Sequence, residues 1–197
     1  MKTLRSLRGL LLAGGLSSRM GRDKASLVHP DGRTLARRGY DLLRDAGCEK
    51  VMLSLRGGQE IPSGFSDIRD LSVIRDPEGE EGGPRIAILA AMRELPAADW
   101  LVIACDLPRL DLATLRHLVS SRREGERFLT YRSEFDGLPE PLCAFYASDA
   151  AAFLIEPEAG SLRNILMLHE CRLLDPVTPR SLDNANTPAD WLDATRS

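Results

Sequence analysis

Residues 10–27 read LLLAGGLSSRMGRDKASL. The apolar run that begins this stretch stops at Gly14-Gly15, and a polar loop with Ser17, Arg19 and Lys24 follows. An apolar run that ends in glycines predicts a buried strand followed by a turn. Glycines let backbone N–H groups approach an anion, while arginine and lysine side chains neutralise its charge. The stretch therefore predicts a strand that leads into a phosphate-binding loop.

Two familiar phosphate-binding motifs do not fit this loop. A P-loop needs Gly-Lys-Ser/Thr at its end, whereas Gly21 is followed by Arg22, and the glycine spacing does not match the dinucleotide motif G-x-G-x-x-G. Lys24 is one of only three lysines in a chain with 26 lysines and arginines. A compact ammonium suits a phosphate oxygen in a tight loop, although a solvated surface lysine is the alternative.

Composition favours a single domain that binds small molecules. A length of 197 residues suits one domain, residues 1–197, and a net charge of −3 without an extended basic run argues against nucleic-acid binding. We find neither a membrane-length apolar segment nor a complete signal peptide, so the expected location is the cytoplasm. The four cysteines lack a C-x-x-C pair, which predicts reduced structural thiols.

Apolar runs that predict strands alternate with helical patterns along the rest of the chain. We expect strands at residues 7–13, 25–28, 50–55, 71–75, 100–105, 128–131, 142–146 and 172–177, and helices at residues 35–45, 85–94, 112–123, 148–155, 161–168 and from 188 onward. This order predicts a single three-layer α/β/α domain with a Rossmann-like, mostly parallel sheet. Residues 100–105, the most apolar strand, should lie near its centre.

Two carboxylates follow predicted strands directly. Asp76 follows residues 71–75, and Asp106 comes after residues 100–105. Ligands of parallel sheets bind beyond the carboxyl ends of the strands, where Gly14 is also expected. Asp106 can bind Mg²⁺, which needs only one or two carboxylates when phosphate oxygens and water complete its shell. The alternative for each aspartate is a turn residue before a nearby proline.

These motifs resemble those of the nucleotidyltransferases, and in particular of the molybdenum cofactor guanylyltransferases. Residues 12–24 resemble the signature L-A-G-G-x-x-x-R-M-G-x-D-K, Asp106 lies in C-D-x-P, and residues 184–188 match N-x-N-T-P. The resemblance covers residues 10–192. It implies a fold of the nucleotide-diphospho-sugar transferase type and Mg²⁺-dependent transfer of GMP from GTP to molybdopterin, with release of pyrophosphate.

The resemblance also implies roles for single residues. Arg19, Lys24 and Asp106 are the expected catalytic residues, with Asp106 and Asn184 at the metal. The backbone of residues 12–14 is expected to present amides and carbonyls to guanine. The expected nucleotide-binding residues are Leu12, Ala13, Gly14, Gly15, Ser17, Lys24, Ser54, Asp76, Gly83 and Asp106. The expected partners are GTP, a molybdopterin-type acceptor, and a molybdoenzyme or chaperone.

This chain departs from the family pattern at four positions. Ser54 replaces an asparagine. Arg85 and Ala87 follow Gly83-Pro84, where the family has G-P-L-A-G. With these two residues either the backbone approaches its ligand less closely or Arg85 contacts a phosphate. Glu140 replaces a histidine in the loop 132–141, which is the expected rim of the second-substrate pocket. These departures keep three alternatives open: a cytidylyltransferase, a sugar-phosphate nucleotidyltransferase and a non-catalytic nucleotide-binding module.

Overall fold

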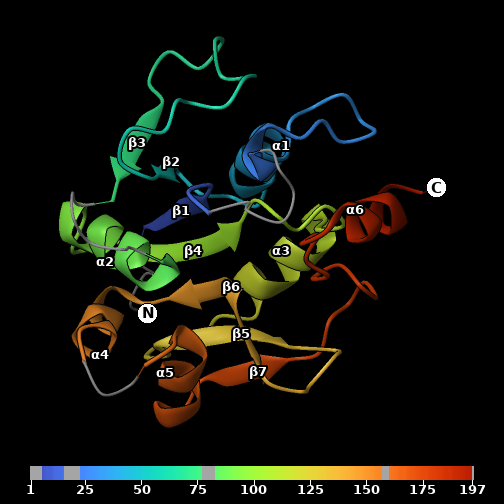
Figure 1. Ribbon diagram of the computed structural model, residues 1–197. Coiled ribbons are helices and arrows are strands. Elements are labelled where there is room, and N and C mark those ends of the chain that lie inside the picture. The colour runs from blue at the N-terminus through green and yellow to red at the C-terminus, as the bar shows by residue number, and fades with distance from the viewer. Residues whose placement is uncertain (1–5, 16–22, 77–82, 157–159, 197) are drawn as a thin grey trace.

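The computed structural model describes residues 6–15, 23–76, 83–156 and 160–196 of the chain. Seven strands form one sheet in the order β3-β2-β1-β4-β6-β5-β7 (Figure 1). The strands are β1 (Leu7–Leu12), β2 (Lys50–Leu55), β3 (Ser72–Arg75), β4 (Asp99–Ala104), β5 (Phe128–Arg132), β6 (Pro139–Tyr146) and β7 (Arg172–Leu174). The most apolar strand, β4, is the central one, as its sequence predicts.

The sheet is parallel except for β6, which runs antiparallel to both β4 and β5. In the parallel part, Leu12 on β1 lies beside Ser54 on β2 and Ala104 on β4. The carboxyl ends of these three strands therefore lie side by side at one edge of the sheet. The loops that follow them converge there, which is the arrangement that βαβ topology requires.

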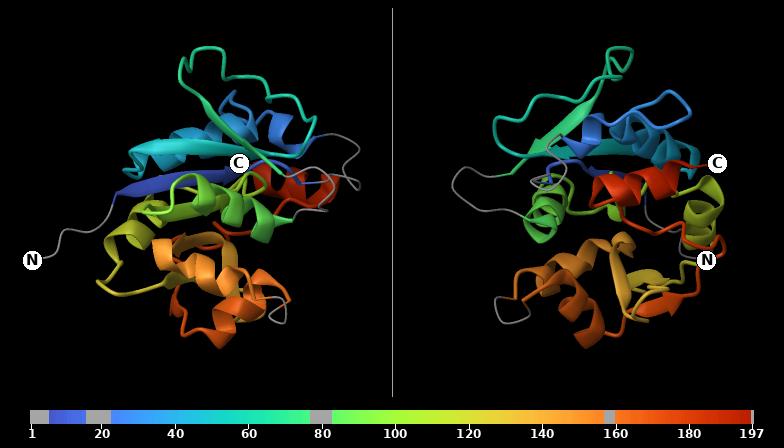
Figure 2. Two further views of the ribbon diagram at one scale, coloured as in Figure 1. Left: turned by 90° about the vertical axis from the view of Figure 1, so that its left-hand side faces the viewer. Right: turned by 45° about the vertical axis from the view of Figure 1, so that its right-hand side comes forward.

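Helices cover both faces of this sheet and complete a three-layer domain (Figure 2). The helical segments are η1 (Lys24–Ser26), α1 (Leu35–Asp45), α2 (Pro84–Glu94), α3 (Leu112–Ser120), η2 (Ser148–Ala150), α4 (Ala151–Leu154), α5 (Leu162–Leu168) and α6 (Pro188–Thr195). One core layer packs α1 and α3 against the sheet, and the other packs α2, α4 and α5. Alternate residues of β1 serve the two layers, with Leu11 in the first and Leu10 in the second.

Local chemistry explains where the helices begin and how closely they pack. The side chains of Thr34, Asp111 and Ser161 each accept a hydrogen bond from a backbone N–H in the first helical turn. Gly39 lies where α1 crosses β1, and a Cβ there would be 2.7 Å from Leu11 Cδ1. The absence of a side chain at Gly39 lets the helix approach the strand. None of the helices in the described ranges is long and apolar enough to span a membrane.

Several boundaries differ from the sequence prediction. The predicted strand at residues 25–28 is a 3₁₀ turn, because the Asp23 carboxylate accepts a hydrogen bond from Ala25 N–H and caps it; only Val28 pairs, in a single bridge. Strand β6 begins within the predicted loop, since Pro139 pairs with Arg132 across the hairpin. The helix predicted at residues 148–155 is divided into η2 and α4, α3 ends at Ser120, and β7 ends at Leu174.

Candidate active site

The end of β1 makes a close approach to the loop after β2. Ala13 N–H donates to the carbonyl of Ser54 at 2.9 Å. A Cβ on Gly14 would lie 3.1 Å from the backbone nitrogen of Arg56, whereas one on Gly15 would meet nothing within 4 Å. The tight packing between the two loops thus favours glycine at position 14. Gly15 has no such constraint from the described residues, so its small size is available to a ligand.

Gln59 connects three segments at this edge and was missed by the sequence analysis. Its Nε2 donates to the carbonyl of Ala13 at 3.0 Å and to Asp23 Oδ2 at 3.2 Å, while its Oε1 accepts from Arg56 N–H at 3.1 Å. The carboxamide therefore fixes the end of β1, the cap of η1 and the loop after β2 relative to one another. The sequence did offer one signal for this role, since Gln59 lies in a glycine-rich loop directly after a buried strand.

Lys24 brings the phosphate-binding stretch into contact with two distant segments. Its Nζ donates to Asp106 Oδ2 at 3.0 Å and to Asn186 Oδ1 at 2.8 Å. The lysine side chain is only 14% exposed and that of Asp106 is 23% exposed. An ion pair with this degree of shielding fixes the ammonium more firmly than a solvated surface pair does. The structure thus brings the predicted Lys24 and Asp106 together.

Asp106 is held from both sides through its backbone. Cys105 N–H donates to the carbonyl of Leu12, and the carbonyl of Asp106 accepts from Ala185 N–H, each at 3.0 Å. Its Oδ1 is buried and has no hydrogen-bond partner among the described residues. A buried carboxylate oxygen without a donor is suited to a cation. The described residues contain no group of three or more His, Cys, Asp or Glu side chains placed for a metal, but Mg²⁺ needs only one or two carboxylates when phosphates supply the rest.

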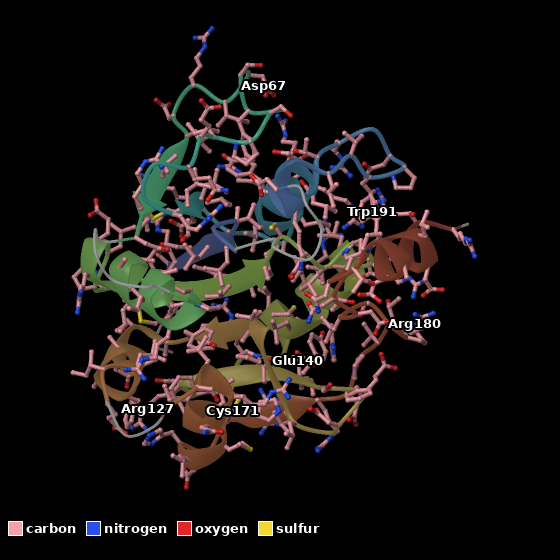
Figure 3. The ribbon with its side chains drawn as sticks, in the orientation of Figure 1. Asp67, Arg127, Glu140, Cys171, Arg180 and Trp191 are labelled. Atoms are coloured by element: carbon pink, nitrogen blue, oxygen red, sulfur yellow. The ribbon has the colours of Figure 1, made fainter. Side chains whose placement is uncertain are left out.

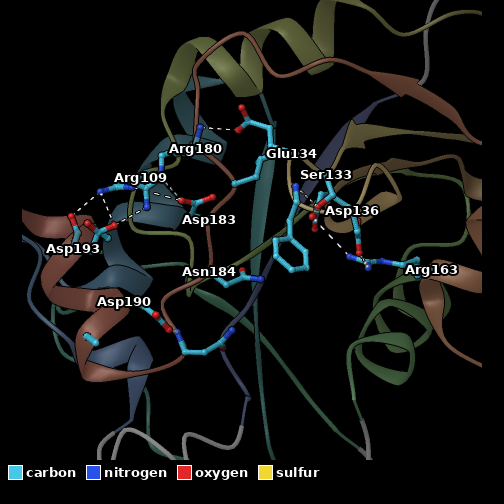
Figure 4. A pocket seen from close by; sticks show the side chains of 16 residues that line it. Arg109, Ser133, Glu134, Asp136, Arg163, Arg180, Asp183, Asn184, Asp190 and Asp193 are labelled. Carbon is cyan, nitrogen blue, oxygen red and sulfur yellow. Dashed lines mark hydrogen bonds and ion pairs between the residues drawn. The ribbon is translucent and has the colours of Figure 1, made fainter.

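The two asparagines of the N-x-N-T-P motif lie in different places. Asn186 contacts Lys24 and belongs to the N-terminal end of α6, where its N–H donates to Asp190. Asn184, the predicted metal neighbour, is exposed and lines a pocket beside α6 (Figure 4). The capping box of Thr187 and Asp190 holds the start of α6 and thereby the position of Asn186.

Asp76 and Arg56 lie at the ends of the neighbouring strands. Asp76 N–H donates to the carbonyl of Leu55 at 3.0 Å. Its Oδ1 and the Nε of Arg56 are both buried without a hydrogen-bond partner in the part of the chain that the structure describes. Burial raises the pKa of Asp76, and the positive charge of Arg56 opposes that rise. Arg75 supports this corner by donating to the carbonyls of Arg56 and Gln59.

The remaining predicted positions have simple placements. Ser54 is buried in β2, and Gly83 adopts φ 75° at the start of α2. Arg85 donates to the carbonyl of Gly160 at 3.1 Å, away from the Lys24 contacts, and Ala87 packs in the core. The Leu12 carbonyl and the N–H and carbonyl of Ala13 all have hydrogen-bond partners within the fold. Among residues 12–14, only Gly14 has a backbone without such a partner in the part of the chain that the structure describes. The predicted Ser17 and Arg19 lie outside the described residues.

A pocket of about 780 Å³ adjoins these residues on the α6 side. It shares Asn186 with the Lys24 contacts, so the two sites are adjacent. Charged side chains dominate its lining, with six carboxylates and three guanidinium groups. The guanidinium groups pair with the carboxylates, as in Arg163 with Asp136 at 2.7 Å and Arg180 with Asp193 at 2.6 Å. Figure 3 locates Glu140 and Arg180 on this side of the molecule.

Comparison with known proteins identifies relatives over most of the chain. The profile of the MobA-like NTP transferase domain matches residues 9–172. A molybdenum cofactor biosynthesis bifunctional protein from Synechocystis is 34% identical over 188 residues, which are 94% of this chain but only 52% of that protein. The chain therefore spans about half the length of this relative. A "Probable molybdenum cofactor guanylyltransferase" from Rhodopirellula baltica is 32% identical, with 93% of this chain and 89% of that protein covered.

Solved structures share the fold. A nucleotidyl transferase from Methanothermobacter superposes with a TM-score of 0.79 at 20% identity, covering 96% of this chain and 95% of that one. The molybdopterin-guanine dinucleotide biosynthesis protein A from Archaeoglobus fulgidus gives a TM-score of 0.70 at 24% identity, covering 95% and 96%. These matches confirm the predicted three-layer fold of the nucleotide-diphospho-sugar transferase type.

Proposed function

The chain belongs to the MobA-like NTP transferase family, and on that premise we propose that it transfers GMP from GTP to molybdopterin in a Mg²⁺-dependent reaction. The observation that carries the proposal is the contact of Lys24 Nζ with Asp106 and Asn186. Beside it lies a buried carboxylate oxygen of Asp106 that has no hydrogen-bond partner among the described residues. This arrangement offers both a cation for phosphate oxygens and an anion for a metal. A triphosphate with a divalent cation needs both.

The reaction follows from the charges of its partners. The terminal phosphate oxygen of the acceptor attacks the α-phosphorus of GTP, a new P–O bond forms, and the bond to pyrophosphate breaks. The acceptor phosphate is already an anion, so no general base is required. Lys24, together with Arg19, neutralises charge that develops on pyrophosphate, and Gly14, Gly15 and Ser17 bind phosphate through backbone amides. The protein contributes mainly position and charge.

Asp106 is the proposed metal ligand, and Asn184 and Asn186 are the proposed neutral oxygen donors, because Ala185 between them contacts the Asp106 carbonyl. The chemistry of this set fits Mg²⁺, which prefers oxygen ligands. Bound Mg²⁺ would supply charge neutralisation to the phosphate oxygens. Lys24 donates to the Asp106 carboxylate and fixes its orientation, and Asn186 in turn accepts a hydrogen bond from Lys24.

We place the nucleotide at the ends of β1, β2 and β3. The support is Asp76 Oδ1, which has no hydrogen-bond partner in the described ranges, and the close approach of Gly14 to the loop after β2. A carboxylate accepts well from the N–H donors of a guanine edge and poorly matches the acceptors of cytosine. We therefore expect calorimetric titration in magnesium to give tighter binding of GTP than of ATP or CTP. Asp76→Asn should weaken GTP binding roughly tenfold, whereas Asp70→Asn, in the exposed part of the preceding loop, should not.

The pocket beside α6 is the proposed acceptor site, because Asn186 belongs both to it and to the Lys24 contacts. We further propose that residues 1–197 act as one domain in the cytoplasm and hand the product to a molybdoenzyme or chaperone. No nucleic acid or membrane is part of this proposal. The support for these statements is the similarity of the chain to relatives that are named for molybdenum cofactor biosynthesis.

Release of pyrophosphate from GTP in the presence of molybdopterin tests the function. Activity with GTP alone among the nucleotides supports guanylyl transfer. Preference for CTP would identify a cytidylyltransferase. Activity only with a sugar phosphate as acceptor would identify a sugar-phosphate nucleotidyltransferase. Tight GTP binding without pyrophosphate release under any of these conditions would identify a non-catalytic nucleotide-binding module.

A further inference from the structure

Phe135 is a large apolar side chain that the fold leaves 96% exposed. It lies in the turn between β5 and β6 and lines the pocket beside α6. Folding normally gains free energy by burying an aromatic side chain of this size, and an exposed Phe135 does not contribute this gain. A single exposed apolar residue is ordinary on a protein surface, so its meaning depends on whether the turn holds it in place.

Hydrogen bonds hold the turn that carries Phe135. Ser133 N–H donates to the carbonyl of Leu138 at 2.8 Å, and Gly137 N–H donates to the carbonyl of Ser133 at 2.9 Å. Leu138 N–H donates to Asp136 Oδ1 at 3.1 Å, while Arg163 holds the other oxygen of Asp136 at 2.7 Å. The backbone that carries the ring is therefore fixed within the turn and to α5. Binding of a flat ligand against the ring then requires ordering of the Phe135 side chain but not of the turn.

Glu140 supplies a carboxylate on the same pocket wall. Its side chain is 19% exposed, and its Oε1 lies 3.8 Å from the nearest Arg163 nitrogen, too far for a direct hydrogen bond. Arg163 instead makes its short contact with Asp136. The Ser133 side chain makes a hydrogen bond to the Glu140 carboxyl. A carboxylate has about four acceptor positions, so Glu140 keeps acceptor capacity beyond this contact, within a pocket in which carboxylates outnumber guanidinium groups. A wall of this charge repels a phosphate but accepts hydrogen bonds from N–H donors.

We infer that Phe135 and Glu140 together bind the pterin ring of the acceptor, with Phe135 stacking on the ring face and Glu140 accepting from its N3–H and 2-amino groups. The inference deepens the proposed function and rests on it for the acceptor class. The acceptor phosphate then lies at the part of the pocket lined by Asn186, which contacts Lys24. Glu140, which replaces a family histidine, is in this view a specificity residue for the ring and does not contact the phosphate.

The amide–amino edge that Glu140 would recognise is shared by pterin and guanine. The test therefore uses 6-hydroxymethylpterin, lumazine, which has a carbonyl in place of the 2-amino group, and guanosine. Fluorescence titrations with wild type should give tighter binding of the pterin than of lumazine. Glu140→Gln should remove most of this preference, since the amide cannot accept two hydrogen bonds from one edge.

Phe135→Ala should weaken pterin binding roughly tenfold, the effect typical of lost aromatic stacking, whereas Phe135→Tyr should retain it. Leu168→Ala is the matched control, because Leu168 is 67% exposed on α5 but does not line the pocket. Absence of pterin binding in wild type, equal affinities of Phe135→Ala and Leu168→Ala, or guanosine binding in place of pterin would each overturn the inference.

Kinetic measurements separate this inference from the proposed function. If it holds, Phe135→Ala raises the KM for molybdopterin and leaves the KM for GTP unchanged. An active wild type with an unchanged acceptor KM in Phe135→Ala would refute the ring site and leave guanylyl transfer standing. Pterin binding that depends on Phe135 and Glu140 in a protein without guanylyltransferase activity would refute the function and leave the ring site standing.

Discussion

Lys24 and Asp106 are 82 positions apart in the chain, yet the lysine Nζ lies 3.0 Å from the Asp106 carboxylate. The contact joins the loop after β1 to the end of β4, the neighbouring strand in the sheet. The lysine also reaches Asn186 at the start of α6. One ammonium therefore links three motifs that are separate in sequence, and this geometry makes them one site.

Lys24→Ala is expected to lower turnover far more than stability. Loss of one charge that acts mainly in the transition state commonly costs about 10²-fold or more in rate. The free energy of unfolding should fall by only about 1 kcal/mol or less, the range of a partly exposed ion pair. Lys50→Ala is the matched control, because Lys50 is exposed at the start of β2. Near wild-type pyrophosphate release by Lys24→Ala would remove Lys24 from the catalytic residues.

Asp106→Asn is expected to keep GTP binding measurable and to abolish most Mg²⁺-dependent turnover. The carboxamide preserves the shape and the backbone contact to Ala185, but it lacks the charge that favours a divalent cation. Pyrophosphate release should be measured across a magnesium titration, beside Asp70→Asn. A normal magnesium response of Asp106→Asn would reduce Asp106 to a turn residue.

Much of this arrangement was predictable from local patterns. The apolar residues of β1 are followed by Gly14-Gly15, and those of β4 are followed by Asp106. Ligands of parallel sheets bind beyond the carboxyl ends of the strands, so Gly14 and Asp106 were expected at one edge. Helix caps such as Thr34 and Asp111 were also predictable, since they depend on residues a few positions away. These inferences needed only short-range periodicity and the topology of βαβ units.

The sequence analysis missed contacts that depend on side-chain geometry. Gln59 has no motif of its own, and its role follows from three loops that meet only in the folded chain. The 3₁₀ turn at Lys24–Ser26 replaced a predicted strand because one Asp23 hydrogen bond outweighed an apolar pattern. Phe135 gave no periodic signal, because its exposure depends on how the hairpin turn is held.

Gly14→Ala and Gly15→Ala are expected to fail in different ways. A Cβ on Gly14 would lie 3.1 Å from the Arg56 backbone nitrogen, so the loops must shift and the melting temperature should fall. A Cβ on Gly15 meets no atom of the described residues within 4 Å, so Gly15→Ala should leave the melting temperature nearly unchanged. If Gly15 lies against phosphate, its variant nevertheless binds GTP more weakly. Calorimetric titration decides this, and wild-type GTP affinity in Gly15→Ala would exclude a phosphate contact there.

The pH dependence of stability should differ in sign between Glu140 and Asp111. Burial raises the pKa of Glu140 above its ordinary value of 4.5; nearby Asp136 and Asp183 add to this effect, and Ser133 and Arg163 oppose it. Burial acts in the same direction on Asp111, but there the hydrogen bonds from Thr114 and Thr178 outweigh it and lower the pKa. Proton linkage then converts each direction into a trend of stability with pH.

For Glu140 the folded protein holds the proton more tightly than the unfolded chain, so the free energy of unfolding falls as pH rises from about 4.5 through the folded pKa. Glu140→Gln cannot ionise and avoids this loss. Its stability relative to wild type should therefore increase over that window and stay level above it. Asp111→Asn should show the reverse, with its deficit relative to wild type shrinking as pH falls below the ordinary value of 3.8. Urea unfolding of the three proteins across this pH range measures both trends. A relative stability of Glu140→Gln that declines with rising pH would mean that Arg163 stabilises the ionised carboxylate more than burial destabilises it.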